Sequence, residues 1–261
     1  MKRILPIITI VTLLLASCTS QKKLAYLNNL PVPDGQEYFT LEIPDYKIQH
    51  RDILYITAKA MDKDGIIKDF LSSGGANTAT GQAQSDAGAY LYGYDVRTDS
   101  TISIPAIGFI KVEGLTLEEI RKVVQERVDR VFRNTTVECK LLSFKFTVIG
   151  EVSAPGTYVN YNNYLTVLEA IGRAGGVGDY GNRDRVLVVR PAEKGSKTYR
   201  MNLQDKSILK SEAYFLLPND VVIVEPMPQK IFNMNLPTIA FIISSITSTV
   251  TMTLLLIEYF K

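Results

Sequence analysis

A few residues of this chain have types or spacings that could do chemistry. The run GVGDYG at residues 176–181 has the G-x-G-x-x-G spacing of loops that bind a dinucleotide pyrophosphate. Glu118 and Glu119 are adjacent carboxylates, a pair that could be taken for a general acid and base, and His50 is the one histidine. The elements expected around these residues decide whether any of them forms a catalytic or binding site.

The glycine run lies on the wrong side of its helix for nucleotide binding. A pyrophosphate loop follows a strand and precedes a helix, so that the phosphates meet a helix N-terminus. Here a helix is expected from Thr166, and the β-like run RVLVVRP at residues 185–191 follows the glycines. The glycines therefore fall at a helix C-terminus, where carbonyl oxygens repel phosphate. We predict no cofactor; a nucleotide-binding enzyme is the alternative that micromolar nicotinamide or flavin binding would support.

The paired glutamates have a structural explanation. Thr116 and Glu119 have the spacing of a capping box, in which each side chain bonds the other residue's backbone N–H. Adjacent helix positions point about 100° apart, so Glu118 and Glu119 do not converge on one bond. Thr166 and Glu169 repeat the box. His50 has no motif around it and no Cys/His cluster suggests a metal site, so we predict that the chain is not an enzyme. The first helix should bury one face, formed by Ile120, Val124, Val128 and Val131.

The N-terminus is typical of an exported lipoprotein. Lys2 and Arg3 precede an apolar run, and Leu15-Ala16-Ser17-Cys18 matches the bacterial lipobox. We predict a signal peptide at residues 1–17 and lipidation at Cys18; the alternative is an ordinary signal peptide with a chance cysteine. Cys139 would then have no internal disulfide partner, and its β-like surroundings predict a small buried thiol.

The chain between the termini divides into a polar tether at 18–40 and two small α/β domains at 41–145 and 146–230, an α+β fold. Gly- and Ser-rich sequence at residues 72–89 predicts a long mobile loop. Strands are expected in YKIQHRDILYITA (a pair joined at residues 50–52), AYLYGYDV, TISIPAIGFIKV, TTVECKLLS, FKFTVIGEV, RVLVVRP, KTYRMNL and DVVIVEP.

Several of these segments resemble a known family, the Wza-type outer-membrane polysaccharide export lipoproteins. TDSTISIPAIGFIKVEGLTLEEI is similar to the signature of their export domain, and VIGEVSAPGTYV, TVLEAIGRAGG and LPNDVVIVEP are similar to their β-grasp-like SLBB module. Two positions depart from the pattern. His50-Arg51 replaces a common Pro-Gly, which makes a turn with positive φ less expected at Arg51. Asp99-Ser100 replaces an Asp-Gly turn.

The C-terminal segment is long and apolar enough to cross a membrane, and we predict a transmembrane helix at 236–258. No charge occurs between Lys230 and Glu258, yet seven residues of 244–253 are Ser or Thr. On a helical wheel Ile and Val gather on one side and small or hydroxylated side chains on the other. Leu255 interrupts the polar side, whose predicted pore-lining members are Ser244, Thr247, Ser248, Thr251 and Glu258.

Three interpretations of this helix stay open: a ring of helices with a wet interior, tight helix association, and a plain anchor. The resemblance implies the ring, and with it an oligomeric outer-membrane channel subunit for capsular or exopolysaccharide. It also implies a lipid-anchored chain that lies mostly in the periplasm, with an inner-membrane co-polymerase, often a tyrosine autokinase, as partner. The alternative is a periplasmic glycan-binding or scaffold lipoprotein with a simple anchor. A net charge near +2, with dispersed Lys and Arg, predicts no nucleic-acid partner.

Overall fold

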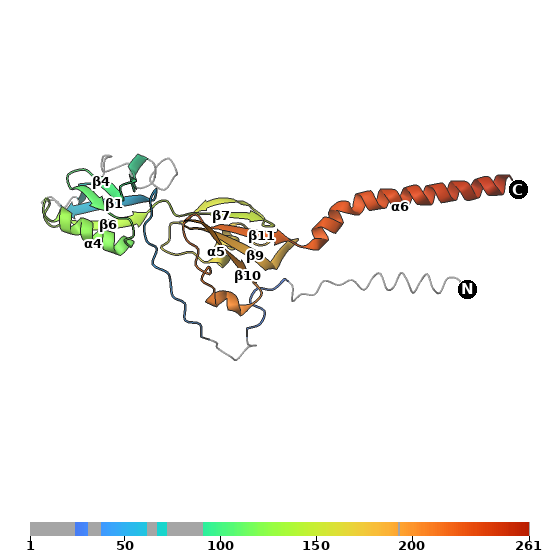
Figure 1. Ribbon diagram of the computed structural model, residues 1–261, viewed down its shortest axis with the longest axis horizontal. Helices are drawn as coiled ribbons and strands as arrows, with labels where there is room; N and C mark the ends of the chain where they lie inside the picture. Colours follow the sequence, from blue (N-terminus) through green and yellow to red (C-terminus); the bar gives the residue numbers. More distant parts are fainter. Residues whose placement is uncertain (1–23, 31–37, 62–66, 72–90, 193, 261) are drawn as a thin grey trace.

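A computed structural model of the chain describes residues 24–30, 38–61, 67–71, 91–192 and 194–260. The predicted signal peptide, Cys18 and the Gly- and Ser-rich loop at 72–89 lie outside these residues. The described chain is α+β: two units that each combine a sheet with one helix, followed by a long C-terminal helix (Figure 1). The first unit ends with strand β6, and the second begins at β7.

The first unit is built around strand β1 (Ile53–Met61), which has antiparallel neighbours on both sides. β6 (Thr136–Leu141) lies along one edge, and the short strands β2 (Ile67–Asp69) and β3 (Tyr94–Asp95) share the other. The hairpin of β4 (Thr101–Ile104) and β5 (Gly108–Lys111) and the helix α4 (Leu117–Val128) complete the unit. Its core gathers buried Ile, Leu and Val side chains, among them Leu54, Ile56, Ile102, Ile120 and Val124.

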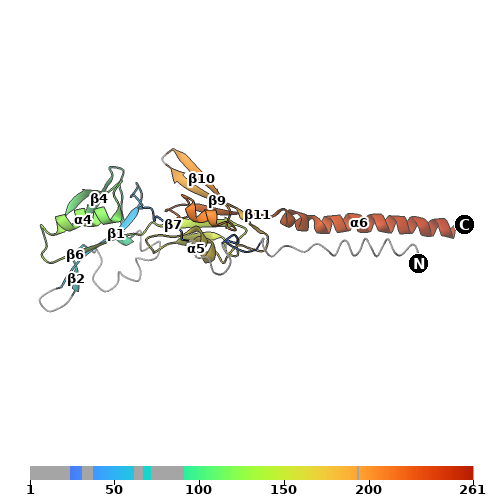
Figure 2. The ribbon, with the colours of Figure 1, turned by 90° about the horizontal axis from the view of Figure 1, so that it is seen from below.

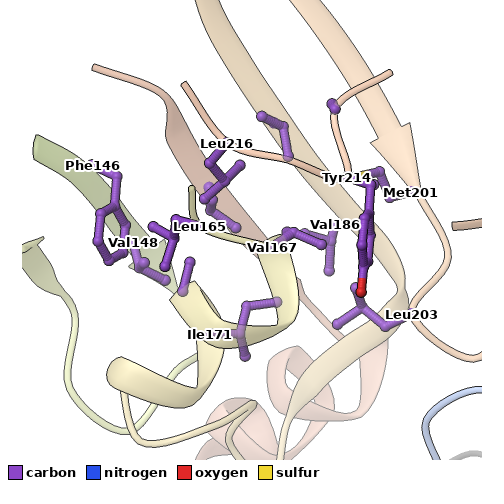
Figure 3. Packing of buried hydrophobic residues seen from close by; sticks show 14 of the residues in the cluster. Phe146, Val148, Leu165, Val167, Ile171, Val186, Met201, Leu203, Tyr214 and Leu216 are labelled. Carbon is purple, nitrogen blue, oxygen red and sulfur yellow. The ribbon is translucent and has the colours of Figure 1, made fainter. Parts of the chain in front are cut away.

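The second unit is a five-stranded sheet in the order β10-β9-β11-β7-β8 with the helix α5 (Val167–Arg173) packed on it. β11 runs parallel to β7 and antiparallel to β9, so the sheet is mixed. Figure 3 shows how Phe146 and Val148 of the sheet meet Leu165, Val167 and Ile171 from α5 and the residues before it. The strands are β7 (Lys145–Gly150), β8 (Gly156–Val159), β9 (Gly181–Ala192), β10 (Gly195–Met201) and β11 (Val221–Pro226), with the 3-10 helix η2 at Lys206–Lys210.

Both predicted capping boxes are present. The Thr116 hydroxyl accepts from the Glu119 N–H, and the Glu119 carboxylate accepts from the Thr116 N–H; Thr166 and Glu169 make the same pair. Glu118 pairs instead with Arg121 on the exposed side of α4. The glutamates therefore serve the helix, as their spacing predicts.

Two strand predictions were wrong because short alternating runs do not distinguish a strand from an irregular segment. Residues 46–49 form no strand: the N–H of Ile48 donates to Leu115, and its carbonyl accepts from Gly114. Of AYLYGYDV only Tyr94–Asp95 is a strand, and the residues before it make a helical turn.

Two further expectations need correction. Val131 is 54% exposed rather than part of the buried face, because α4 has already ended at Val128. Arg51 does adopt a positive φ, of 72°. Hydrogen bonds to its neighbours hold the turn, so the usual preference for glycine is overridden there. Ser100, in the other departure from the family pattern, has a φ of 66°.

The C-terminal helix α6 (Pro228–Tyr259) contains the predicted span and begins before it. Both views show it projecting from the second unit, away from the first (Figures 1 and 2). Its first part bends in Figure 1, and Pro237 inside the helix accounts for a bend because a proline ring cannot donate and crowds the preceding turn. Every described residue of α6 is at least partly exposed.

A buried ion pair holds the second unit together and provides a test of this fold. Arg190 bonds both carboxylate oxygens of Asp220 and the Phe215 carbonyl, and the Leu217 N–H also donates to Asp220. The Asp220 side chain is 0% exposed and that of Arg190 10%. Arg190→Met leaves a buried carboxylate without its cation, which should cost about 3–5 kcal/mol of unfolding free energy.

The measurement is denaturant unfolding in mild detergent, followed by circular dichroism. The double variant Arg190→Met/Asp220→Asn, which removes both charges, should be more stable than Arg190→Met alone. A double variant as unstable as the sum of the two single variants would contradict a coupled pair.

Candidate functional site

Helix α6 is the one helix of the described chain that is long and apolar enough to cross a membrane. At 1.5 Å per residue its 32 residues span about 48 Å, against about 30 Å for a hydrocarbon core. An 18-residue stretch has a mean hydropathy of 1.9 and is not buried. Core helices of soluble proteins pass the same length and composition test, but they are covered by their own chain, whereas the residues that the structure describes leave α6 uncovered.

Small side chains form a shallow groove along one face of α6. Its lining includes four of the five predicted pore residues, so the structure brings these together; Glu258, one turn further on, is not among them. Met252 and Leu255 close the lining, and Leu255 was expected to interrupt the polar stripe. The full lining is Ser244, Thr247, Ser248, Thr251, Met252 and Leu255.

The hydroxyls on α6 bond their own helix. Six of the seven Ser and Thr side chains between 244 and 253 donate to a carbonyl oxygen three or four residues earlier, over 2.7–2.9 Å. Such a hydroxyl is satisfied in lipid, and its oxygen still accepts a bond from water. The stripe can therefore face a wet lumen or a neighbouring helix, and hydrogen bonding alone does not choose between the three interpretations.

The first turn of α6 is fixed to the second unit. The Met227 N–H donates to the Tyr180 carbonyl over 2.7 Å, and the Asn233 amide donates to the Tyr180 hydroxyl over 3.1 Å. Lys230 forms an ion pair with Glu151, whose side chain is 19% exposed. We call these contacts the helix clamp. Sequence analysis missed the clamp because Glu151 and Lys230 are 79 residues apart.

The glycine run supports the clamp rather than a nucleotide. Gly175 and Gly176 end α5 with positive φ, and β9 follows, so the helix precedes the glycines as expected. A Cβ on Gly181 would lie 2.7 Å from the Glu151 carbonyl oxygen and 2.3 Å from Val177 Cγ1. Glycine at 181 therefore lets the backbone beside Tyr180 lie close to the backbone of Glu151. Tyr180 and Glu151 are the two residues of the second unit that contact α6 in the helix clamp.

The remaining candidate residues lie apart from α6. His50 is exposed in a turn of the first unit. Cys139 lies in β6 against the first core, and burial raises the pKa of its thiol to about 12. Within the described residues no three of His, Cys, Asp and Glu gather closely enough to hold a metal ion.

Comparison with known proteins agrees with the two-unit division. The polysaccharide biosynthesis/export protein family matches residues 42–142, and the SLBB domain family matches residues 144–224. The two matches follow one another along the chain in the order that the resemblance implies. The recognised resemblance to Wza-type export proteins is thereby confirmed, and the matched families point to export rather than to an enzyme.

Relatives of this export-family chain carry the name EPS I polysaccharide export outer membrane protein EpsA. The chain is 31% identical to that of Ralstonia solanacearum over 140 residues, which is 51% of this chain and 36% of the relative. It is 31% identical to that of Ralstonia nicotianae over 115 residues, 42% of this chain and 29% of the relative. The chain thus spans about a third of the length of the curated relatives it matches.

The clamp predicts a local effect on proteolysis. Glu151→Gln removes the partner of Lys230, so the first turn of α6 should open more often. Trypsin cleavage after Lys230 should speed up about fivefold, as expected for a loss of ~1 kcal/mol. The rate is measured by mass spectrometry in mild detergent.

The matched control is Glu225→Gln. Glu225 lies on β11 and forms an ion pair with Arg200 of β10 over 3.4 Å, so this variant removes an ion pair that does not involve α6. It should leave cleavage after Lys230 unchanged. Equal rates in both variants would show that the ion pair does not hold the helix.

Proposed function

We propose that this chain is a subunit of an oligomeric outer-membrane conduit for capsular or exopolysaccharide. The observation that carries the proposal is the two-sided helix α6, which is attached to an export-family body and which the described part of the chain leaves uncovered. Several copies in a ring would place the branched apolar side chains toward lipid and the hydroxyl face toward a shared aqueous bore. No bond is made or broken in this activity.

The chemistry of the bore suits passage of a sugar polymer. Hydroxyls that already donate to their own backbone offer water and sugars mainly weak acceptor sites. A polymer held tightly at each sugar could not advance, so weak and repeated contacts favour movement. The body would form periplasmic rings from the domains at 41–145 and 146–230.

The N-terminal contacts support attachment of both chain ends to one membrane. Residues 24–30 fall within the predicted tether, yet they lie on the second unit: the Leu27 N–H donates to Leu203, and Arg183 stacks over Tyr26 at 5.5 Å. From Leu24 back to Cys18 the chain can reach about 20 Å. A lipid on Cys18 would therefore enter the outer membrane near the unit that carries α6.

The first unit would then face the inner membrane, which is where the co-polymerase partner implied by the resemblance would be met. The competing function is a glycan-binding or scaffold lipoprotein in which α6 only anchors the chain. The groove along α6 supports assembly of several copies over a lone anchor, because a single helix surrounded by lipid has little use for a polar face. The two functions predict particles of different size in mild detergent: an anchor allows monomers, whereas a conduit requires a stable ring.

The lumen assignment predicts a loss of export without a loss of assembly. Ser248→Leu with Thr251→Leu fills the hydroxyl face with bulky apolar side chains that lipid-facing helices tolerate. Surface polysaccharide should fall at least tenfold, while size-exclusion chromatography in mild detergent should still find the ring. The matched control, Ile246→Leu with Val250→Leu, changes the opposite face and should export normally. Unchanged export by the Ser248/Thr251 variant would remove these residues from the lumen.

Aqueous access to α6 provides a second test. Single cysteines at Ser244, Ser248 and Thr251 should react with a membrane-impermeant maleimide much faster than cysteines at Ile246 and Val250, because only the first group faces water. Cys139 contributes little background, since its half-buried thiol has a pKa raised to about 12 and stays protonated at neutral pH. Equal protection of both faces in the assembled protein would support the anchor and contradict the bore.

A further inference from the structure

A mostly apolar pocket lies between the loop before α5, the segment before β11 and the first unit. Phe215, Leu217 and Pro218 form its wall on the second unit, and Leu117 and Leu141 close it from the first. None of the lining residues that the structure describes carries a charge. The enclosed space is small, with room for a substituent of a sugar but not for a whole sugar ring. The pocket shares no residue with the helix clamp or with the hydroxyl face of α6.

The polar part of the pocket comes from the loop that joins β8 to α5. Asn162, Asn163 and Tyr164 of this loop line the pocket, and all three residues are exposed. Among the described residues, the side-chain amides of Asn162 and Asn163 have no hydrogen-bond partner. Each amide offers both a donor and an acceptor, so the rim of the pocket can bond a ligand on either kind of group.

The loop is held in place from below by Asn160, which is 1% exposed. The Asn160 amide donates to the Asn162 carbonyl over 2.8 Å, and its side-chain oxygen accepts from Arg173 of α5 over 3.0 Å. Arg173 also donates to the Val159 carbonyl of β8 over 3.1 Å. The fold therefore fixes the loop without using the two exposed amides.

The wall of the pocket on the second unit is also fixed. The Arg190 guanidinium donates to the Phe215 carbonyl over 2.8 Å, and the Leu216 N–H donates over 2.8 Å to Leu165, the residue that follows the loop. The Tyr164 ring meets the Phe215 ring edge to face, with 6.1 Å between the ring centroids. Tyr164 is still 46% exposed, so much of its ring remains open to a ligand at the mouth of the pocket.

These groups together favour an acetamido group on a neutral sugar. The methyl of an acetamido group is apolar and fits the enclosed space, while its N–H and carbonyl match the acceptor and the donor of an asparagine amide. An aromatic side chain offers a flat apolar surface and can pack against the apolar face of a sugar ring. An acidic sugar would bring a charge that no lining residue compensates.

We propose that this pocket binds an N-acetylated neutral sugar of the polymer that the conduit carries. The acetamido methyl enters the apolar space, Asn162 and Asn163 bond the amide and a neighbouring hydroxyl, and the sugar ring rests on Tyr164. The source of the sugar rests on the proposed function, whereas the acetamido chemistry rests on the pocket itself. The contacts are few and mostly open to water, so one such site per subunit favours a polymer without arresting it.

The test uses a reporter inside the pocket. The chain contains no tryptophan, so Tyr164→Trp introduces a single tryptophan fluorophore and keeps an aromatic surface. Triacetylchitotriose, added to this full-length variant in mild detergent, should change its fluorescence in a saturable manner. Cellotriose has the same linkage with hydroxyls in place of the acetamido groups, and it should bind at least tenfold more weakly. Phe109→Trp, at an exposed ring on β5 of the first unit, is the control reporter and should not respond.

Asn162→Ala and Asn163→Ala, each made together with Tyr164→Trp, should weaken binding of triacetylchitotriose about fivefold, as expected for one neutral hydrogen bond. The matched control is Gln49→Ala, which removes an exposed amide outside the pocket and should leave binding unchanged. All three variants should unfold at the same denaturant concentration as the parent, because the amides of Asn162 and Asn163 have no partner in the described chain. Equilibrium dialysis with the wild-type protein should give the same preference for triacetylchitotriose.

Equal affinity for cellotriose, a silent Tyr164→Trp reporter, or an equal loss of binding with Gln49→Ala would each overturn the site. Tighter binding of tri-galacturonate than of triacetylchitotriose would also overturn it. A wild-type ring that conducts in planar bilayers but does not prefer triacetylchitotriose would refute the site and keep the conduit. Binding at the pocket by a protein that stays monomeric and does not conduct would refute the conduit and keep the site.

Discussion

An apolar helix that the described part of its own chain leaves uncovered is the constraint on which the rest of this molecule depends. α6 carries large exposed side chains such as Phe241, Ile243 and Leu254 along a span longer than a hydrocarbon core. Water disfavours that surface strongly, and neither folded unit offers a face to cover it. In lipid the same helix is stable as a single element, because its backbone and most of its hydroxyls are bonded within it. In the proposed conduit, other copies of the chain would decide what its two faces contact.

A two-sided helix presents one chosen face to its neighbours only if its rotation about its own axis is fixed. The clamp ties its first turn to the second unit through Tyr180 and the Glu151–Lys230 pair, so packing between folded bodies would set which face points inward. Gly181 makes the clamp possible by allowing close approach to the Glu151 backbone. The run that imitates a nucleotide loop is thus part of the mechanical link between body and helix. Beyond the clamp, Pro237 allows the helix axis to change direction.

The features that sequence predicted are those whose cause is local. Capping boxes at Thr116 and Thr166 and the glycines that end α5 each depend on residues within a few positions, and all are present. The pairs Arg190–Asp220 and Glu151–Lys230 join residues 30 and 79 positions apart. Hydrophobic periodicity relates residues within one helix or strand, so it does not predict such distant pairs. The side-chain pattern did place four hydroxyls of α6 on one face, because the helical repeat relates residues that are close in sequence.

Arg51 is a position where contacts distant in sequence override a local preference. Local preference argues against an arginine with positive φ. The structure adopts it because the Arg51 N–H bonds the distant Val96 carbonyl and the Gln49 N–H bonds the Asp52 carboxylate within the turn. The hydroxyls of α6 are the opposite case, because their backbone acceptors lie three or four residues earlier in the sequence. In the proposed conduit these self-bonded hydroxyls would offer a sugar polymer mainly weak acceptor sites, so that it could move along the helix without being held.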